Sequence, residues 1–276
     1  MIEGDAQDDV ADYIWPVVFF VTVLNRLIRL SGNIAKLLCY PFHAIAPAER
    51  FSIPAYAPPK GATRIASAVP RVIWQTNYTN RFSLPMYLNY RFNRWLSRGY
   101  AHRYVSTEAR EVFMREHASP EVYKAYRMLT DGAAQADLWR IVTLYMNGGI
   151  YMDIDATLVL PLRIILRGVH KALYIRIKKN TEITNYFLAS VPGNPDYKLI
   201  LERIVQNILS HDGTTRAYTT TGPVVLNQVL ADRAIASRPH RYVCMQGAFT
   251  NEHFQYIDKP RGKWTYQNPK DLVQRG

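Results

Sequence analysis

The first 69 residues fall into three segments that differ in their pattern of polar and apolar positions. Residues 1–12 carry several acidic side chains and no basic one, which predicts a mobile acidic tail. Residues 13–43 begin with an apolar run over 14–24 and continue with apolar residues at helical spacing, separated by basic and amide side chains. Residues 44–69 are rich in proline, which predicts a linker or an extended segment that wraps a domain.

The segment 13–43 predicts an amphipathic helix that has two alternative partners. Its apolar run is shorter than the about 20 residues that a membrane-spanning helix needs, and acids precede it where a signal peptide has bases. Such a helix can lie in a membrane interface, with Trp15, Arg26 and Arg29 at the level of the lipid headgroups. It can also pack on the core of its own domain. We expect membrane contact and keep packing on the domain as the alternative.

From residue 70 onward, strand-like and helix-like stretches alternate. Short buried strands are predicted over residues 71–76 and 100–106, and helices over 84–98, 108–117 and 120–129. This alternation indicates an α/β sheet with helices packed on it. We therefore expect one α/β domain over residues 70–276, preceded by the three N-terminal segments.

Composition and charge narrow the classes of function. The chain has 276 residues, of which 48% are hydrophobic and 20% charged, which excludes a disordered or collagen-like protein. Its 2 cysteines make neither a disulfide framework nor a zinc cluster. The net charge of +12 indicates an anionic partner. Because the basic residues are dispersed and no nucleic-acid-binding motif is present, we expect a membrane surface or a phosphorylated ligand and no nucleic acid.

The segment Gly132–Leu162 carries the chemistry. A helical pattern ends at Asn147-Gly148-Gly149, which is typical of a tight turn. The short strand Ile150-Tyr151-Met152 follows and leads into Asp153-Ile154-Asp155. Strand alternation would place Asp153 and Asp155 on one side, at the carboxyl end of a strand, where open α/β sheets bind ligands.

Two carboxylates in this position repel each other unless a cation lies between them. Mn²⁺ or Mg²⁺ suits such hard oxygen ligands, and an ion held by only one or two carboxylates completes its coordination with substrate phosphates. The pair therefore predicts a diphosphate ligand. The alternative is that Asp153 and Asp155 merely end a strand, as many chance Asp-x-Asp tripeptides do.

Four motifs, in the same order along the chain, resemble one family of enzymes. They are the run ADLWRIVTLYMNGGIYMDID at 136–155, PRVIWQT at 70–76, NYFLAS at 185–190 followed by PGNP at 192–195, and TGP at 221–223. Together they resemble the Asp-x-Asp glycosyltransferases typified by yeast α-mannosyltransferases, α-1,4-galactosyltransferases and bacterial capsule and lipopolysaccharide sugar transferases (glycosyltransferase family 32-like). The likeness extends, more distantly, to the large clostridial glucosylating toxins.

The resemblance implies a GT-A fold, which is a Rossmann-like α/β domain. It also implies a nucleotide-sugar donor, a divalent metal (Mn²⁺ or Mg²⁺) and retention of configuration at the anomeric carbon. Among catalytic residues, Asp137 would contact sugar hydroxyls, Arg140 the sugar or diphosphate, and Asn185 the reacting sugar. Without the motif, Asp137 and Arg140 would be interpreted as an ordinary salt bridge one helical turn apart.

The resemblance also implies donor and metal ligands. Trp74 would stack on the base, and the remaining donor-binding residues would be Gln75, Tyr151, Asp153 and Trp264. Asp155 would bind the metal directly, and Asp153 would contact the ribose and sugar or bind the metal through water. The family's late histidine has no clear counterpart, so either His253 or Asp258 is the candidate for a second metal ligand.

Two rival interpretations remain. Residues 153–158 also fit the DxDxT[LV] nucleophile loop of haloacid-dehalogenase-type phosphatases, but no later pair of neighbouring acids follows to hold Mg²⁺. A non-enzymatic basic membrane adaptor would explain the charge but would leave Asp137, Asp153 and Asp155 without a role. We expect a transferase that moves a hexose from a UDP- or GDP-sugar to a glycan or glycolipid acceptor, in cell-surface polysaccharide or glycolipid synthesis at the cytoplasmic face of a membrane.

Overall fold

The computed structural model describes the chain apart from residues 1–14, 62–66 and 275–276, so the predicted acidic tail lies outside the described residues. Its main sheet comprises β2 (Tyr56–Ala57), β3 (Val72–Thr76), β5 (Ala101–Val105), β6 (Gly149–Met152), β8 (Ala172–Ile177), β9 (Glu182–Ser190) and β10 (Ser237–Pro239). Two smaller antiparallel pairs join β1 (Phe51–Ser52) to β4 (Arg81–Phe82), and β7 (Ala156–Leu158) to β11 (Cys244–Gln246).

The main sheet is mixed, with the order β10-β8-β9-β6-β3-β5-β2. Strand β3 is parallel to its neighbours β5 and β6, whereas β9 is antiparallel to β6 and β8. The carboxyl ends of β5, β3 and β6 therefore lie side by side at one edge of the sheet. In open α/β sheets this edge is where ligands bind.

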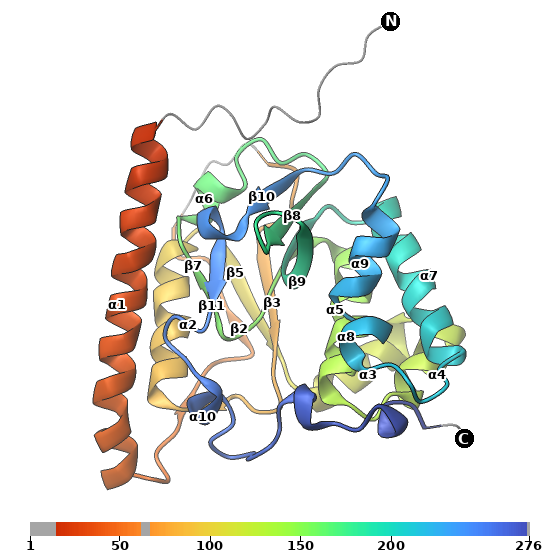
Figure 1. The fold of residues 1–276 in the computed structure, drawn as a ribbon, viewed down its shortest axis with the longest axis horizontal. Coiled ribbons are helices and arrows are strands. Elements are labelled where there is room, and N and C mark those ends of the chain that lie inside the picture. Colours follow the sequence, from red (N-terminus) through yellow and green to blue (C-terminus); the bar gives the residue numbers. More distant parts are fainter. Residues whose placement is uncertain (1–14, 62–66, 275–276) are drawn as a thin grey trace, which may run out of the picture.

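Helices cover both sides of the sheet (Figure 1). On one side lie α1 (Trp15–Ile45) and α2 (Leu84–Leu96), and on the other α3 (Thr107–His117), α4 (Pro120–Met128), α5 (Gly132–Asn147), α7 (Pro195–Leu209), α8 (Ala217–Thr220) and α9 (Pro223–Leu230). The shorter α6 (Leu162–Ile165) and α10 (Glu252–Gln255) and three 3₁₀ turns, His240–Tyr242, Trp264–Tyr266 and Pro269–Asp271, complete the secondary structure. The predicted α/β class with a preceding N-terminal helix is confirmed.

The predicted elements around the Asp-x-Asp motif are confirmed as well. Helix α5 begins after Asp131, whose Oδ1 accepts hydrogen bonds from the backbone N–H groups of Ala133 and Ala134 at 2.6 and 2.9 Å. It ends at Gly148 and Gly149, which have φ values of 62° and 97°. A Cβ on Gly149 would lie 2.8 Å from the carbonyl oxygen of Val72, so this glycine turn is what lets β6 lie directly beside β3.

The described residues of the proline-rich segment 44–69 run along the domain, as expected of the second predicted alternative, an extended wrapping segment. Strand β2 lies in it and pairs with β5 at the edge of the main sheet, and β1 pairs with β4. The side chain of Arg94 in α2 donates to the carbonyl of Pro58 at 2.7 Å. This segment therefore holds α1 close to the domain.

One face of α1 packs on the domain. The opposite face, called the bare face below, exposes its side chains to solvent. Val21, Ile28 and Cys39 are 2%, 5% and 2% exposed, and their spacing places them on one side of the helix with Gly32. A Cβ on Gly32 would lie 2.1 Å from the carbonyl oxygen of Ala248, so backbone meets backbone there. On the outer side, the exposed large apolar side chains are Phe19, Phe20, Val23, Leu27, Leu30, Ile34, Leu37 and Leu38.

Replacing Gly32 by alanine tests this close packing. Alanine raises helix propensity by about 1 kcal/mol over glycine, so the change would stabilise a free helix. Here we expect it to lower the free energy of unfolding by about 1–3 kcal/mol, because the new methyl group overlaps the backbone of Ala248. Chemical denaturation measures the difference, and Ser31→Ala at an exposed neighbouring position is the control. A Gly32→Ala protein that is as stable as the control would contradict the packing.

Candidate active site

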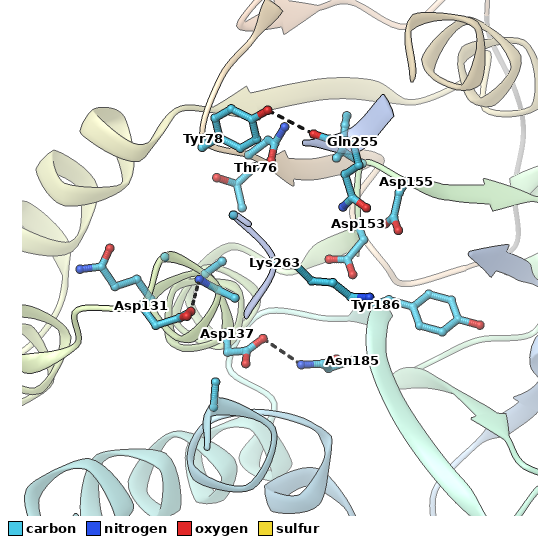
Figure 2. A pocket seen from close by; sticks show the side chains of 18 of the residues that line it. Thr76, Tyr78, Asp131, Asp137, Asp153, Asp155, Asn185, Tyr186, Gln255 and Lys263 are labelled. Atoms are coloured by element: carbon cyan, nitrogen blue, oxygen red, sulfur yellow. Dashed lines mark hydrogen bonds between the residues drawn. The ribbon is translucent and has the colours of Figure 1, made fainter. Parts of the chain in front are cut away.

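A cavity of about 790 Å³ opens at the carboxyl ends of β3, β5 and β6. Its walls come from segments that are far apart in the sequence, as Figure 2 shows for the labelled side chains. The lining residues that matter below are Thr76, Tyr78, Arg110, Asp131, Asp137, Arg140, Tyr151, Asp153, Asp155, Asn185, Tyr186, Gln246, Gln255, Lys259 and Lys263. The two aspartates of the Asp-x-Asp motif lie on the opposite side of the cavity from Asp131.

A buried ion pair on α5 forms the centre of the cavity wall. The guanidinium of Arg140 lies 2.9 Å from Oδ1 of Asp137, one helical turn away, and both side chains are nearly inaccessible to solvent. Asn185 donates to the same carboxylate oxygen at 2.9 Å, and Thr221 donates to the other oxygen at 3.0 Å. Three of the four motifs that the sequence analysis singled out therefore meet at Asp137.

Arg140 also connects this pair to the Asp-x-Asp motif. Its Nη1 donates to the backbone carbonyl of Asn185 at 2.7 Å and lies 3.5 Å from Oδ1 of Asp153. The guanidinium stacks over the ring of Tyr151, at 4.1 Å from the centroid. The Tyr151 hydroxyl in turn donates to Asp153 at 2.6 Å. The position of Asp153 is thus fixed by contacts from α5 and β6.

Asp153 and Asp155 both line the cavity, but strand alternation is not the reason. Strand β6 ends at Met152, and the next residues form a turn in which the N–H of Ala156 donates to the carbonyl of Asp153 at 3.1 Å. Both carboxylates point into the cavity because of this turn, and not because side chains alternate along an extended strand. Gln246 of β11 lies beside them and donates to Oδ2 of Asp153 at 3.2 Å.

The carboxyl groups of Asp155 and Asp137 are buried, which disfavours their charged forms and raises both pKa values. Burial raises the pKa of Asp155 to about 7, and repulsion from Asp153 adds to the rise. Burial also raises the pKa of Asp137 to about 7, although Arg140 and the hydroxyl of Thr221 oppose the shift. Among the described residues no cation forms a salt bridge with Asp155. The charge of Arg140 lowers the pKa of Asp155 only in part, so Asp155 has the weakest compensation of the three carboxylates.

The residues present fit a small divalent cation. Two carboxylates that repel each other offer hard oxygen ligands, which Mn²⁺ and Mg²⁺ prefer. The described residues contain no group of three or more His, Cys, Asp or Glu side chains that could hold a metal alone. The remaining coordination would have to come from water or from a ligand in the cavity, which fits the expectation of a diphosphate.

Several predicted site residues do not reach the cavity. The indole N–H of Trp74 donates to the carbonyl of Gly148 at 3.0 Å, because the side chain lies against the turn that ends α5. Gln75 is buried at 2% exposure and does not line the cavity. Neither residue lines the cavity in this structure, and their contact with a nucleotide stays a prediction. The side chain of Trp264 lies outside the described residues.

The two alternatives for a second metal ligand also lie away from the Asp-x-Asp motif. Asp258 forms a paired salt bridge with Arg50, with N–O distances of 2.6 and 2.7 Å. The ring of His253 stacks on Tyr40 of α1 at a centroid distance of 5.5 Å. Neither side chain lines the cavity. In this structure both belong to the contact between the N-terminal segment and the α10 region.

Sequence reasoning missed other residues that do line the cavity. Tyr78, four residues after Trp74, presents an aromatic ring there, and its hydroxyl donates to the carbonyl of Gln255 at 3.1 Å. Lys259 and Lys263, whose position beside the late motif predicts contact with the leaving diphosphate, line the cavity as well and bring positive charge to it. Arg110 and Asp131 were not singled out, because each is an isolated charged residue that only the tertiary fold brings to the site.

Comparison with known proteins supports the resemblance stated from the motifs. Residues 85–172 match the family described as "Glycosyltransferase sugar-binding region containing DXD motif". The chain is 29% identical over 135 residues to an initiation-specific alpha-1,6-mannosyltransferase of Candida albicans, over 46% of this chain and 34% of that protein. It thus spans about a third of the length of this relative. The resemblance predicted from the motifs is confirmed over residues 85–172.

Two solved structures resemble part of this chain. The PaToxG glycosyltransferase aligns over 76% of this chain and 79% of its own, with 15% identity and a TM-score of 0.46. The UDP-bound glycosyltransferase domain of the YGT toxin aligns over 54% of each chain, with 12% identity and a TM-score of 0.37.

The pKa of Asp155 yields a prediction for the metal-free protein. An unfolded aspartate titrates near pH 4, so between about pH 4 and 7 the folded state holds a proton that the unfolded state has released. The free energy of unfolding should therefore fall as pH rises through this range, by at most about 1.4 kcal/mol per pH unit. The Asp155→Asn side chain does not titrate, so the free energy of unfolding of this variant should not fall for this reason. We expect the variant to be more stable than the wild type at pH 8 in chelator, with the difference disappearing at pH 4.

Thermal unfolding at both pH values measures this difference. Adding Mn²⁺ at pH 8 should stabilise the wild type and leave Asp155→Asn unchanged. Equal stability of the two proteins at pH 8 in chelator would show that burial and the repulsion of Asp153 do not destabilise the charged form of Asp155.

Proposed function

We propose that this chain is a metal-dependent retaining glycosyltransferase that moves a hexose from a nucleotide-diphosphate sugar to a glycan or glycolipid acceptor. One observation carries the proposal: the Asp-x-Asp motif lies in the same cavity as the buried pair Asp137–Arg140, and the two are joined through Arg140. The family match over residues 85–172 favours this activity over the phosphatase and adaptor alternatives.

Departure of the nucleoside diphosphate is the step that such a site must assist. A divalent cation held by Asp155 and Asp153 would supply charge neutralisation of the leaving diphosphate. Lys259 and Lys263 line the same cavity, where their ammonium groups add positive charge. Arg140 keeps Asp153 in place and balances its charge, so that the two carboxylates can stay close together before the ligand arrives.

The sugar would lie over Asp137 and Asn185. Asp137 already accepts from Arg140, Asn185 and Thr221, and this fixes its carboxylate for contact with sugar hydroxyls. The same contacts make Asp137 a poor nucleophile, because an attack on the anomeric carbon would remove it from three hydrogen-bond donors at once. Retention is therefore best served by a front-face route, in which the acceptor hydroxyl enters on the side that the diphosphate leaves.

Hydrolysis of a panel of UDP- and GDP-sugars in Mn²⁺ tests the activity. We expect the wild type to release sugar from one of these donors, and a chelator to abolish the release. Asp155→Ala should lower the rate about 100-fold or more, as expected when a stabiliser of transition-state charge is lost. Asp232→Ala, which removes an exposed carboxylate that does not line the cavity, is the control and should keep the wild-type rate. No release from any donor, together with no Mn²⁺-dependent nucleotide binding, would overturn the proposal.

The bare face of α1 supports membrane attachment of this enzyme. Over Val18–Ile45 the helix is long and apolar enough to cross a membrane, with a mean hydropathy of 1.2. Its inner face, however, packs on the domain from Val21 to Cys39. In this arrangement we propose that α1 lies flat in the cytoplasmic interface, with Leu30 and Leu37 among the side chains that enter the lipid. Arg26 and Arg29 lie on the flank, where headgroups would meet them.

Co-sedimentation with anionic phospholipid vesicles tests the attachment. Leu30→Glu with Leu37→Glu places two charges on the bare face and should abolish binding, because each burial of a charge in lipid costs several kcal/mol. Thr22→Glu with Asn33→Glu adds the same charge on the flank and should retain most of the binding. Both double variants should keep wild-type hydrolysis of a soluble donor. Equal loss of binding in the two would show that net charge, and not the apolar face, attaches the protein.

A further inference from the structure

Arg110 is a buried cation that forms no salt bridge with any of the described residues. It lies in the first turn of α3, is 2% exposed and forms part of the cavity wall. Its Nη1 and Nη2 make only long hydrogen bonds, to the carbonyl of Gly132 at 3.3 Å and to the hydroxyl of Thr107 at 3.4 Å, and its Nε has no partner there. Buried charges in proteins are ordinarily paired, so this one is short of an acceptor.

Asp131 offers unused acceptor capacity next to Arg110. Arg110 bonds to the carbonyl of Gly132, the next residue in the chain. Of the two carboxylate oxygens of Asp131, Oδ1 accepts from the N–H groups of Ala133 and Ala134. None of the hydrogen bonds among the described residues uses Oδ2, although Asp131 lines the cavity. A donor-only group and an acceptor-only group therefore line the same cavity, and Arg110 contacts the residue that follows Asp131.

The place of this pair in the cavity indicates which part of a nucleotide would reach it. Strands β6, β3 and β5 are neighbours in that order. The metal-binding carboxylates follow β6, whereas Arg110 follows β5, and Asp131 lies across the cavity from Asp153 and Asp155 (Figure 2). A donor whose diphosphate lies at Asp155 would extend its nucleoside across the end of β3 toward Arg110. The aromatic ring of Tyr78, two residues beyond β3, lines this path.

Among the common bases, guanine matches the pair best. Its O6 and N7 accept from an arginine, while its N1–H and N2–H₂ groups both donate to a carboxylate. Uracil presents one N–H between two carbonyl oxygens, so a carboxylate that accepts from it would be flanked by two repelling oxygens. Adenine presents a single amino donor on that edge. We propose that Arg110 and Asp131 read the guanine base of the donor and make the enzyme selective for a GDP-sugar; this inference rests on the proposed function.

Calorimetric binding of nucleoside diphosphates to the full chain in Mn²⁺ tests the inference. The wild type should bind GDP about tenfold or more tightly than UDP, and IDP more weakly than GDP because inosine lacks the N2 amino group. Arg110→Met should weaken GDP binding about tenfold or more. Asp232→Asn, an exposed carboxylate elsewhere, is the control and should leave all affinities unchanged.

A variant that changes its preferred nucleotide is the stronger test. A loss of binding can result from misfolding, whereas a misfolded protein cannot gain affinity for a new nucleotide. Xanthine carries a carbonyl where guanine carries the N2 amino group. Asp131→Asn keeps an oxygen to cap α5 and turns an N–H₂ donor toward the base. We expect this variant to prefer XDP to GDP, reversing the wild-type order.

The outcomes separate this inference from the proposed function. Tighter binding of UDP than of GDP by the wild type, or an Asp131→Asn protein that still prefers GDP, would overturn the guanine assignment and leave the transferase intact. Failure of every nucleoside diphosphate to bind in Mn²⁺ would overturn both.

Discussion

The site depends on one buried guanidinium. Arg140 neutralises Asp137, supports Asp153 and fixes the backbone of Asn185, so it joins α5, the Asp-x-Asp turn and β9. Without it, three carboxylates would line one cavity wall with no guanidinium to offset their repulsion. Arg140 therefore makes the acidic site compatible with a folded protein. Arg140 forms no salt bridge with Asp155, so among the described residues this carboxylate is the least compensated of the three, and a cation from outside has a place there.

A second constraint is the close approach of backbones. Glycines at 148 and 149 let β6 lie beside β3, and Gly32 lets α1 lie on the loop that contains Ala248. The same loop region continues into Thr250 and Asn251, which line the cavity, and Asn251 donates to the hydroxyl of Tyr40 on α1 at 2.9 Å. The helix that we propose to contact the membrane is thus in direct contact with a wall of the site. Attachment and catalysis share a structural element.

How much the sequence predicted differs between the parts of the molecule. Hydrophobic periodicity located the helices and strands from β3 to β6, and the motifs identified Asp137, Arg140, Asp153, Asp155 and Asn185, all of which line one cavity. Those residues lie in or next to regular elements, where local pattern determines position. Trp74 does not line the cavity, because its side chain lies against the glycine turn that ends α5. Arg110 and Asp131 gave no local signal, since their meaning comes from a contact between α3 and α5.

The most direct test of the account is the location of the metal. Crystals grown with Mn²⁺ and a nucleoside diphosphate would give an anomalous scattering peak at the manganese position. The account predicts one peak between the diphosphate and Asp155, with Asp153 beside it and Arg140 still paired with Asp137. A peak held by other side chains, or a bound nucleotide with no metal at Asp155, would contradict the central claim that this acidic pair exists to bind a cation.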